Sequence, residues 1–230
     1  MELWEGVVEA VRMVARADPY LRDVALRTLL VSGSATLLAM AVGVPLGYLL
    51  ARARFPGRTV VLTAVHTGMG LPPVIAGLVI FLLFVRSGPF GGLGLIYTPQ
   101  AMVIAQFVIA LPMVVGFTAA AVASLPVEFS ELLAMLGAGP LRTMWLTVRE
   151  ARLGLLAAVM AGFGAVISEV GASMTVGGNL AGSTRVLTTA IVLEASRGEH
   201  ARAIALGVIL LALALAVNFI LTSFQQRRGA

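Results

Sequence analysis

The chain has 230 residues, of which 59% are hydrophobic and 12% are charged, with a net charge of +5 and no cysteine. About a quarter of the residues in a soluble domain are charged, so this composition excludes an ordinary soluble protein and indicates an integral membrane protein. The absence of cysteine excludes disulfides, thiol catalysis and cysteine-based metal sites. Every basic residue is an arginine, and the arginines are scattered between apolar runs, a distribution that gives nucleic-acid binding no support.

Residues 1–20 are predicted to form an interfacial amphipathic segment ahead of a membrane domain at 21–230. Glu2, Glu5 and Glu9 precede the first arginine, and no unbroken apolar core follows them, so the pattern is not that of a cleavable signal peptide. Apolar residues alternate with these charges, which is typical of a helix lying in the membrane surface.

Uncharged runs predict an all-α membrane protein with about five spanning helices. The first run is about 36 Å long as a helix, enough to cross a hydrocarbon core of about 30 Å. A glycine-rich loop after Arg86 separates the second span from the third. The predicted spans are, in order, 28–51, 59–85, 99–123, 153–171 and 202–223. Arginines divide equally between the two sides, so the positive-inside rule does not orient the chain.

Two prolines interrupt the second span. Pro72 and Pro73 lie among Gly68, Gly70 and Gly77. Prolines inside a spanning helix free backbone groups and bend the helix, which is tolerated where the bend lines a cavity or packs on a neighbour. The pattern predicts a bend, and it leaves open whether the bend lines a path or is only structural.

The stretch 128–155 carries mixed charge between long apolar runs and is therefore expected outside the bilayer. Glycine suits the end of a helix and proline the start of the next, so Gly137 and Pro140 predict a helix, a sharp turn and a re-entering helix. The first helix has an apolar stripe that needs a partner, formed by Phe129, Leu132, Leu133 and Leu136. A helical hairpin packed on its own membrane domain would show the same spacing.

The segment 171–189 is too apolar for a solvated loop and too rich in glycine for a plain span, so it is predicted to be re-entrant. Its backbone N–H groups and hydroxyls suit a passing oxyanion, which needs many neutral donors and few fixed charges if it is to leave again. Close helix packing through small residues is the alternative interpretation. The candidate residues are Gly171, Ser173, Gly177, Gly178, Asn179, Ser183 and Thr184.

Five other polar residues lie in or near predicted spans. Glu169 and Arg185 flank the glycine-rich segment and are functional candidates, although the two could simply form an intramembrane ion pair. Gln106 is expected to make an interhelical hydrogen bond. His66 and His200 have no partner at metal-ligand spacing and are interpreted as structural, so no metal site is expected.

The stretch with Glu131, Gly137-Ala138, Pro140 and Ala151-Arg152-x-Gly154-Leu155 resembles the cytoplasmic coupling loop of ATP-binding-cassette importer permeases. The sequence departs from that family where Leu132 and Leu133 replace two alanines, Gly139 replaces a serine and Glu150 replaces a proline. The segment Gly68–Gly77 and the third span resemble the molybdate, sulfate and tungstate branch. The run from Gly177 to Gly207 is similar to the tungstate permeases in particular.

This resemblance implies a type I importer permease fold with a coupling loop at about 125–150 that docks in a groove of an ATPase. The implied coupling residues are Glu131, Leu132, Leu133, Leu136, Gly137, Ala138 and Arg142. The implied translocation path and gate comprise Pro72, Pro73 and the glycine-rich segment, with Arg185 at its outer mouth.

The resemblance also implies partners. They are a second copy of the chain, two cytoplasmic ATPase subunits that bind ATP and magnesium, and an extracytoplasmic binding protein. The N-terminus would lie outside the cell membrane and the C-terminus in the cytoplasm. The chain itself has no GxxxxGK[ST] motif and no expected cofactor or enzymatic role. Tungstate is the expected substrate, molybdate or sulfate are alternatives, and an ion-driven secondary transporter is the alternative from another class.

Overall fold

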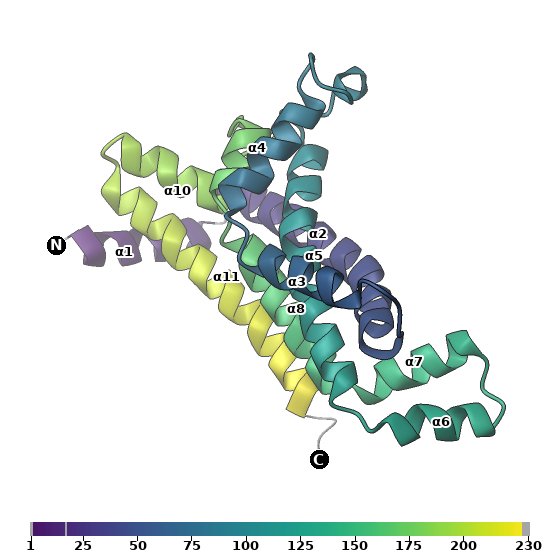
Figure 1. Cartoon of the computed structure of the whole chain (residues 1–230). Coiled ribbons are helices and arrows are strands. Elements are labelled where there is room, and N and C mark those ends of the chain that lie inside the picture. Colours follow the sequence, from purple (N-terminus) through teal and green to yellow (C-terminus); the bar gives the residue numbers. More distant parts are fainter. Residues whose placement is uncertain (1, 17, 227–230) are drawn as a thin grey trace.

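The structure is a computed structural model that describes residues 2–16 and 18–226. Within these ranges every regular element is helical, and Figure 1 shows a long, tilted bundle with shorter helices at both ends. The elements are, in chain order, α1 (Glu2–Ala15), α2 (Pro19–Arg52), α3 (Arg58–Met69), α4 (Pro73–Phe84), the 3₁₀ turn η1 (Gly91–Leu93), α5 (Pro99–Ala123), α6 (Val127–Met135), α7 (Pro140–Glu150), α8 (Arg152–Ile167), α9 (Gly171–Gly177), α10 (Leu187–Ser196) and α11 (His200–Gln226).

Three helices of the described chain, α2, α5 and α11, are long and apolar enough to cross a membrane alone. Two bent pairs, α3 with α4 and α7 with α8, raise the number of spans to as many as five by length and composition. Four of the predicted spans correspond to α2, to α3 with α4, to α5 and to α11, while the predicted span 153–171 corresponds to α8 alone, which ends at Ile167. The first span begins earlier than its uncharged run because the Asp18 side chain accepts hydrogen bonds from the N–H groups of Tyr20 and Leu21, and Pro19 occupies the first turn of α2.

Small residues hold the centre of the bundle together, where α2 packs along α5. A Cβ placed on Gly43 would lie 2.9 Å from a methyl group of Val114, and one on Gly47 would lie 2.7 Å from the Thr118 side chain. Apolar side chains gain little from leaving lipid for protein, so helices in membranes associate through close backbone packing of this kind. Larger residues at these two positions would force α2 and α5 apart.

The second predicted span is broken rather than bent. α3 ends at Met69 and α4 begins at Pro73, and their axes differ by 103°. Between them the N–H groups of Gly70 and Leu71 bond back to Thr67 and Gly68, while the two prolines have no N–H to continue a helix. The sequence predicted a bend within one helix, but the helix is interrupted, because consecutive prolines remove two successive backbone donors.

α1 is an amphipathic helix, as the alternation of charged and apolar residues predicts. Its packing face lies against α11, where Gly6 lies directly on Ile204 and Ala10 and Met13 are buried. Leu3, Trp4, Val11 and Val14 remain exposed on its other faces. An exposed apolar face on a helix that is already docked fits a position at the membrane surface, which stays a prediction.

Candidate functional site: an exposed elbow, a broken helix and a glycine-rich loop

The stretch 125–150 folds as the sequence predicts, into two short helices, α6 and α7, joined by a tight turn. The two helices and the turn together form an elbow. The N–H of Leu136 bonds to the carbonyl of Leu132 at 3.0 Å, and the N–H of Ala138 bonds to the carbonyl of Leu133 at 2.9 Å. Between them Gly137 has φ +77°, the left-handed conformation that glycine adopts at little cost. Pro140 then starts α7.

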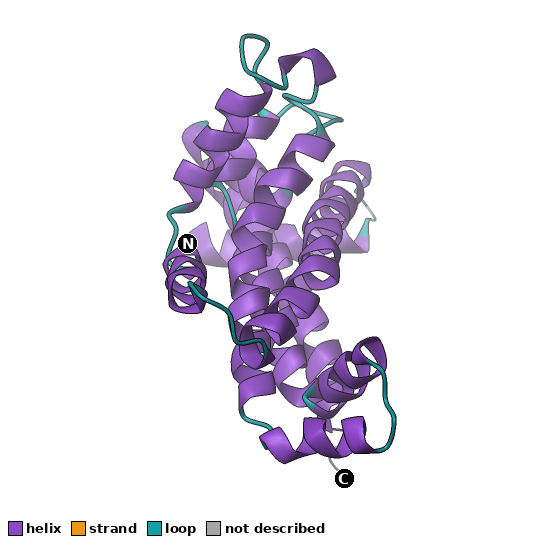
Figure 2. Cartoon of the chain, turned by 45° about the vertical axis from the view of Figure 1, so that its right-hand side comes forward, coloured by secondary structure: helices purple, strands orange, loops and turns teal. Residues whose placement is uncertain are grey.

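The elbow projects from the bundle, as Figures 1 and 2 show. Its apolar side chains are largely exposed. Leu132 is 50% exposed, Met135 78% and Leu136 75%, whereas Phe129 and Leu133 are half-buried. Glu131 and Arg142 are exposed at the same elbow, and Ala138 is half-buried. A patch of this kind is typical of a surface that contacts another protein or a membrane.

Two arginines that the sequence did not single out flank the turn between α2 and α3, and the first of them ties the elbow to the bundle. A terminal nitrogen of Arg52, at the end of α2, donates to the carbonyls of Leu125 and Pro126 at 3.1 and 3.4 Å. The Arg58 Nε donates to the carbonyl of Leu50 at 2.8 Å. Movement of the elbow would therefore be transmitted to the turn between α2 and α3. In the sequence, the only feature that distinguished these arginines was their position near the turn residues Pro56-Gly57.

The helix after the proline break, α4, lies against α9, the first part of the glycine-rich segment. A Cβ on Gly77 of α4 would lie 2.6 Å from the Cα of Ala172, and one on Gly171 would lie 2.6 Å from a methyl group of Val74. Pro72 is exposed and Pro73 is half-buried at the start of α4. Their role in a gate stays a prediction.

The predicted re-entrant segment is a short helix, α9, followed by an ordered loop that leads into α10. Thr184 organises the loop: its hydroxyl donates to the carbonyl of Gly177 and accepts from the N–H of Leu180. Gly178 and Asn179 have φ +69° and +51°, which turns the chain sharply. Hydrogen bonds thus fix the path of the loop.

Arg185 is held at the end of this loop by Asn179. Its Nε donates to Oδ1 of Asn179, and its terminal nitrogen donates to the Asn179 carbonyl, each at 3.2 Å. From α2, Arg27 donates to the carbonyl of Arg185 at 3.0 Å, and the Thr28 hydroxyl accepts from the N–H of Leu187 at 2.9 Å. Arg27 and Thr28 had no sequence signal beyond their place at the start of the first span.

The predicted ion pair between Glu169 and Arg185 is wrong. A Glu169 carboxylate oxygen accepts the N–H of Ala172 at 2.8 Å, and the Glu169 carbonyl accepts the Thr188 hydroxyl at 2.9 Å. The carboxylate turns back onto the first turn of α9, while Arg185 turns to Asn179. Each group satisfies local backbone or side-chain partners, which proximity to the same segment could not reveal.

The expected interhelical hydrogen bond of Gln106 is confirmed, because its side-chain nitrogen donates to the Ser173 hydroxyl of α9 at 3.2 Å. Ser173, Gly177 and Thr184 are buried within the chain, whereas Gly178 is exposed and Ser183, Asn179 and Arg185 are partly exposed. In this conformation the second group, together with the exposed Leu180, Ala181 and Gly182, forms the accessible part of the glycine-rich segment.

A row of threonines on α3 was missed by the sequence reasoning. Thr59, Thr63 and Thr67 follow at intervals of four, are exposed, and line a concavity of about 580 Å³ together with Gly68 and Leu71. Residues four apart lie on one face of a helix, so the spacing itself could have predicted this row. It adds neutral hydroxyls to the face of α3 that ends at the proline break.

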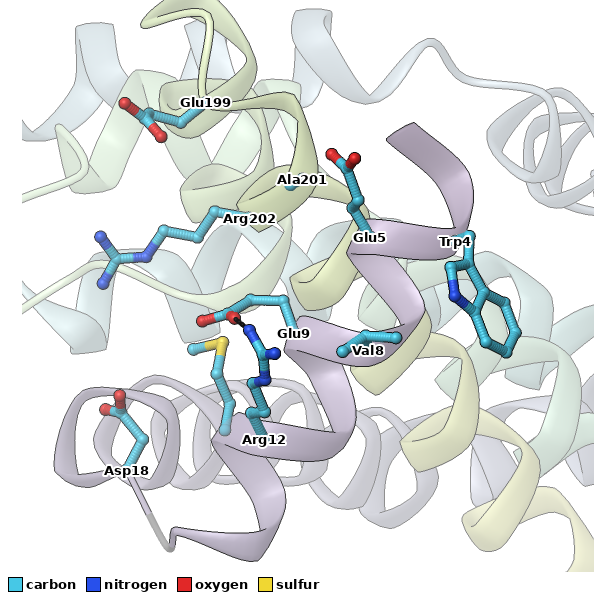
Figure 3. A pocket seen from close by; sticks show the side chains of 10 residues that line it. Trp4, Glu5, Val8, Glu9, Arg12, Asp18, Glu199, Ala201 and Arg202 are labelled. Carbon is cyan, nitrogen blue, oxygen red and sulfur yellow. Dashed lines mark ion pairs between the residues drawn. The ribbon is translucent and has the colours of Figure 1, made fainter. Parts of the chain in front are cut away.

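A second concavity of about 580 Å³ lies where α1 meets the turn between α10 and α11 (Figure 3). Glu9 pairs with Arg12 at 3.7 Å, and Arg202 lies 5.3 Å from the centre of the Tyr20 ring. Side chains of both signs line it, namely Glu5, Glu9, Asp18 and Glu199 with Arg12 and Arg202. Across the described residues no group of three histidine or acidic side chains is arranged to hold a metal ion.

Comparison with known proteins identifies the family. Residues 43–229 match the family described as binding-protein-dependent transport system inner membrane component. The probable anion ABC transporter permease of Haloferax volcanii is 41% identical, over 90% of this chain and 92% of its own length. The tungstate uptake system permease TupB of Peptoclostridium acidaminophilum is 37% identical, over 96% of this chain and 97% of its own. The molybdenum transport permease ModB of Escherichia coli is 28% identical, over 86% of this chain and 90% of its own length.

The fold agrees with this relationship. A solved structure of the MetNI methionine ABC transporter, in inward facing conformations, superimposes with a TM-score of 0.67 at 19% identity, covering 90% of this chain and 94% of that one. The family model and the relative at 41% identity are those of binding-protein-dependent ABC transport systems, so the secondary-transporter alternative is set aside. The chain belongs to the inner-membrane components of binding-protein-dependent transport systems, and it is an ABC importer permease of the oxyanion-transporting group.

Proposed function

We propose that the chain is the permease of a tungstate importer. The observation that carries the proposal is the 37% identity with a tungstate uptake permease along nearly the whole of both chains. A second tungstate permease, from Campylobacter jejuni, is 33% identical over 95% of the chain. Molybdate and sulfate are the second candidates, since permeases for molybdenum and sulfate transport match at 28% identity.

Two copies of the chain would form one path, with two ATPase subunits at the elbows and a binding protein at the opposite face. The exposed leucines of the elbow support the ATPase contact, since Leu132 is 50% and Leu136 75% exposed. ATP and magnesium would be bound by the ATPase subunits. ATP binding would draw the elbows together and open the path outward, and hydrolysis would reset it.

The proposed path combines the reachable part of the glycine-rich loop with the threonine row of α3. Both surfaces offer neutral donors, and neither places a carboxylate among them. Neutral donors bind a divalent oxyanion weakly enough for it to leave. Arg185, fixed by Asn179, supplies one positive charge at the expected outer mouth.

Cellular uptake tests the substrate assignment. The chain is expressed with its ATPase and binding protein in cells that lack high-affinity oxyanion uptake, and cellular tungsten and molybdenum are measured by mass spectrometry. We expect tungsten to accumulate and equimolar molybdate or sulfate to compete poorly. Equal accumulation of both metals would contradict the tungstate assignment and leave the importer class intact.

A further inference from the structure

An apolar cavity of about 390 Å³ opens beside the elbow, away from the proposed path. It lies between α2, the end of α7 and the first turns of α8. The lining consists of apolar side chains and two arginines, and contains no carboxylate: Met40, Val148, Arg149, Arg152, Leu153, Leu155, Leu156 and Val159.

The polar and apolar parts of this cavity are separated along the axis of α8. Arg149 and Arg152 lie at the junction of α7 and α8, where the chain re-enters the membrane domain with a bend of 77°. Leu156 and Val159 follow one and two turns further along α8, about 6 and 10 Å beyond Arg152 at ~1.5 Å per residue. A charged mouth thus leads to an apolar interior.

Trp145 marks the level of this mouth. It is 57% exposed, and the Arg149 guanidinium lies 5.3 Å from the centre of its ring. Tryptophan is enriched at the headgroup level of membranes, where an apolar ring can lie beside polar groups. In the described part of the chain Arg149 forms no ion pair, so its charge is available to a ligand.

We propose that this cavity binds an anionic phospholipid from the leaflet at the elbow end of the bundle. The phosphate lies at Arg149 and Arg152, and an acyl chain runs along Leu153, Leu156 and Val159. Charge complementarity selects this occupant, because basic pockets between membrane helices bind anionic headgroups. An ATPase would meet the projecting elbow and would not reach the apolar wall of α8. A second copy that met this cavity with its own equivalent face would present arginines to the two arginines, and no anion.

The bound lipid would support the joint between the elbow and the membrane domain. Both arginines lie at the bend where α7 passes into α8, so a phosphate between them would oppose changes in that angle. The inference depends on α8 entering the membrane, and it is independent of which oxyanion is carried.

Fluorescence quenching by brominated lipids tests the proposal. Trp4 and Trp145 are the two tryptophans of the chain, so Trp4→Phe leaves Trp145 as the sole reporter. The full chain is placed in phosphatidylcholine nanodiscs that contain equal fractions of either brominated phosphatidylglycerol or brominated phosphatidylcholine. We expect stronger quenching by phosphatidylglycerol, which gives a measurable preference between the two lipids.

Charge variants then locate the headgroup. Arg149→Gln should lower the preference about fivefold, the factor that corresponds to about 1 kcal/mol per basic residue near a membrane surface. Arg149→Lys should retain much of the preference. Arg54→Gln, an exposed arginine of the α2–α3 turn outside the cavity, should leave it unchanged. Because each value is the ratio of the quenching by the two lipids, a change in Trp145 fluorescence that affects both measurements equally cancels.

Three results would overturn the proposal. Equal quenching by the two lipids would show no selection for an anionic headgroup. No quenching by either lipid would show that protein, such as a second copy, covers the cavity. Competition by soluble glycerophosphoglycerol at millimolar concentration would indicate a simple anion site without an acyl chain. Unchanged gel-filtration elution of each variant excludes unfolding, and no transport is measured, so failure here leaves the proposed function untouched.

Discussion

Gly137 is the residue on which the shape of the elbow depends. A β-branched residue at φ +77° would cost about 1–3 kcal/mol of backbone strain, and no atom lies within 4 Å of a Cβ placed there, so the change would alter conformation without a clash. We expect Gly137→Val to uncouple ATP hydrolysis from tungstate transport in the assembled complex. The measurement is substrate-stimulated ATPase activity together with uptake.

Gly139 provides the matched control for that variant. It also has open space around it, but its φ is −66°, which any residue adopts. Gly139→Val should therefore leave coupling nearly unchanged. Coupling that survives Gly137→Val, in a complex that still assembles, would show that the elbow does not transmit hydrolysis.

Ser183 gives the sharper test of the glycine-rich loop. It is partly exposed, whereas Gly178 cannot be substituted cleanly because its φ is positive and the Tyr97 ring would lie 2.7 Å from a Cβ. Ser183→Asp should abolish oxyanion uptake by electrostatic repulsion. Ser183→Asn should retain most of the uptake, because asparagine is neutral and similar in size to aspartate. Equal uptake by the two variants would remove the loop from the path.

Residue roles could be predicted where one position and its spacing determine the chemistry. Gln106 is an isolated amide in an apolar span and had to find a hydrogen-bond partner, and Gly137 preceded a proline at the right distance for a turn. The partner of Arg185 could not be predicted, because it depends on the path of the loop after α9. That path is set by the hydroxyl of Thr184 and by the positive φ of Asn179.

At the scale of elements, a substitution in the threonine row of α3 tests whether the hydroxyls of this row contact the substrate. Thr63→Val keeps the shape of the side chain and removes a hydroxyl that in this conformation donates to the Thr59 carbonyl at 2.9 Å. If that donor turns to the substrate during transport, the loss of one hydrogen bond of about 1 kcal/mol should lower uptake about fivefold. Thr63→Ser keeps the hydroxyl and should transport normally. Initial uptake rates measure the effect, and equal rates for the two variants would place the row outside the path.

The long helices were predictable because uncharged runs of sufficient length leave a chain in lipid few alternatives to a helix. The break between α3 and α4 was underestimated, since a proline pair predicts disturbance and the angle is set by what α4 packs against. Contact between Gly77 and Ala172 holds α4 on α9, and that contact joins segments far apart in sequence.

At the scale of the whole molecule, hydrogen bonds group the loops into two ends. Arg52 joins the α2–α3 turn to the start of the elbow, and Arg27 joins the start of α2 to the glycine-rich loop. The predicted orientation places the first end in the cytoplasm and the second outside. Because the chain has no cysteine, single cysteines can report this arrangement.

In intact cells we expect an impermeant thiol reagent to label Glu199→Cys and to leave Arg54→Cys unlabelled until the membrane is opened. Both positions are exposed, so access to the compartment decides the result. Labelling of Arg54→Cys alone would invert the topology, and with it the assignment of the elbow to a cytoplasmic ATPase.

The central claim is that this chain moves an oxyanion inward with energy supplied by a separate ATPase. Its most direct test is tungstate accumulation in proteoliposomes that contain the permease and its ATPase, with binding protein outside and ATP inside. The account predicts accumulation that requires ATP, the ATPase and the binding protein together, and that is unaffected by collapsing ion gradients. Accumulation driven by an ion gradient without ATP would contradict it.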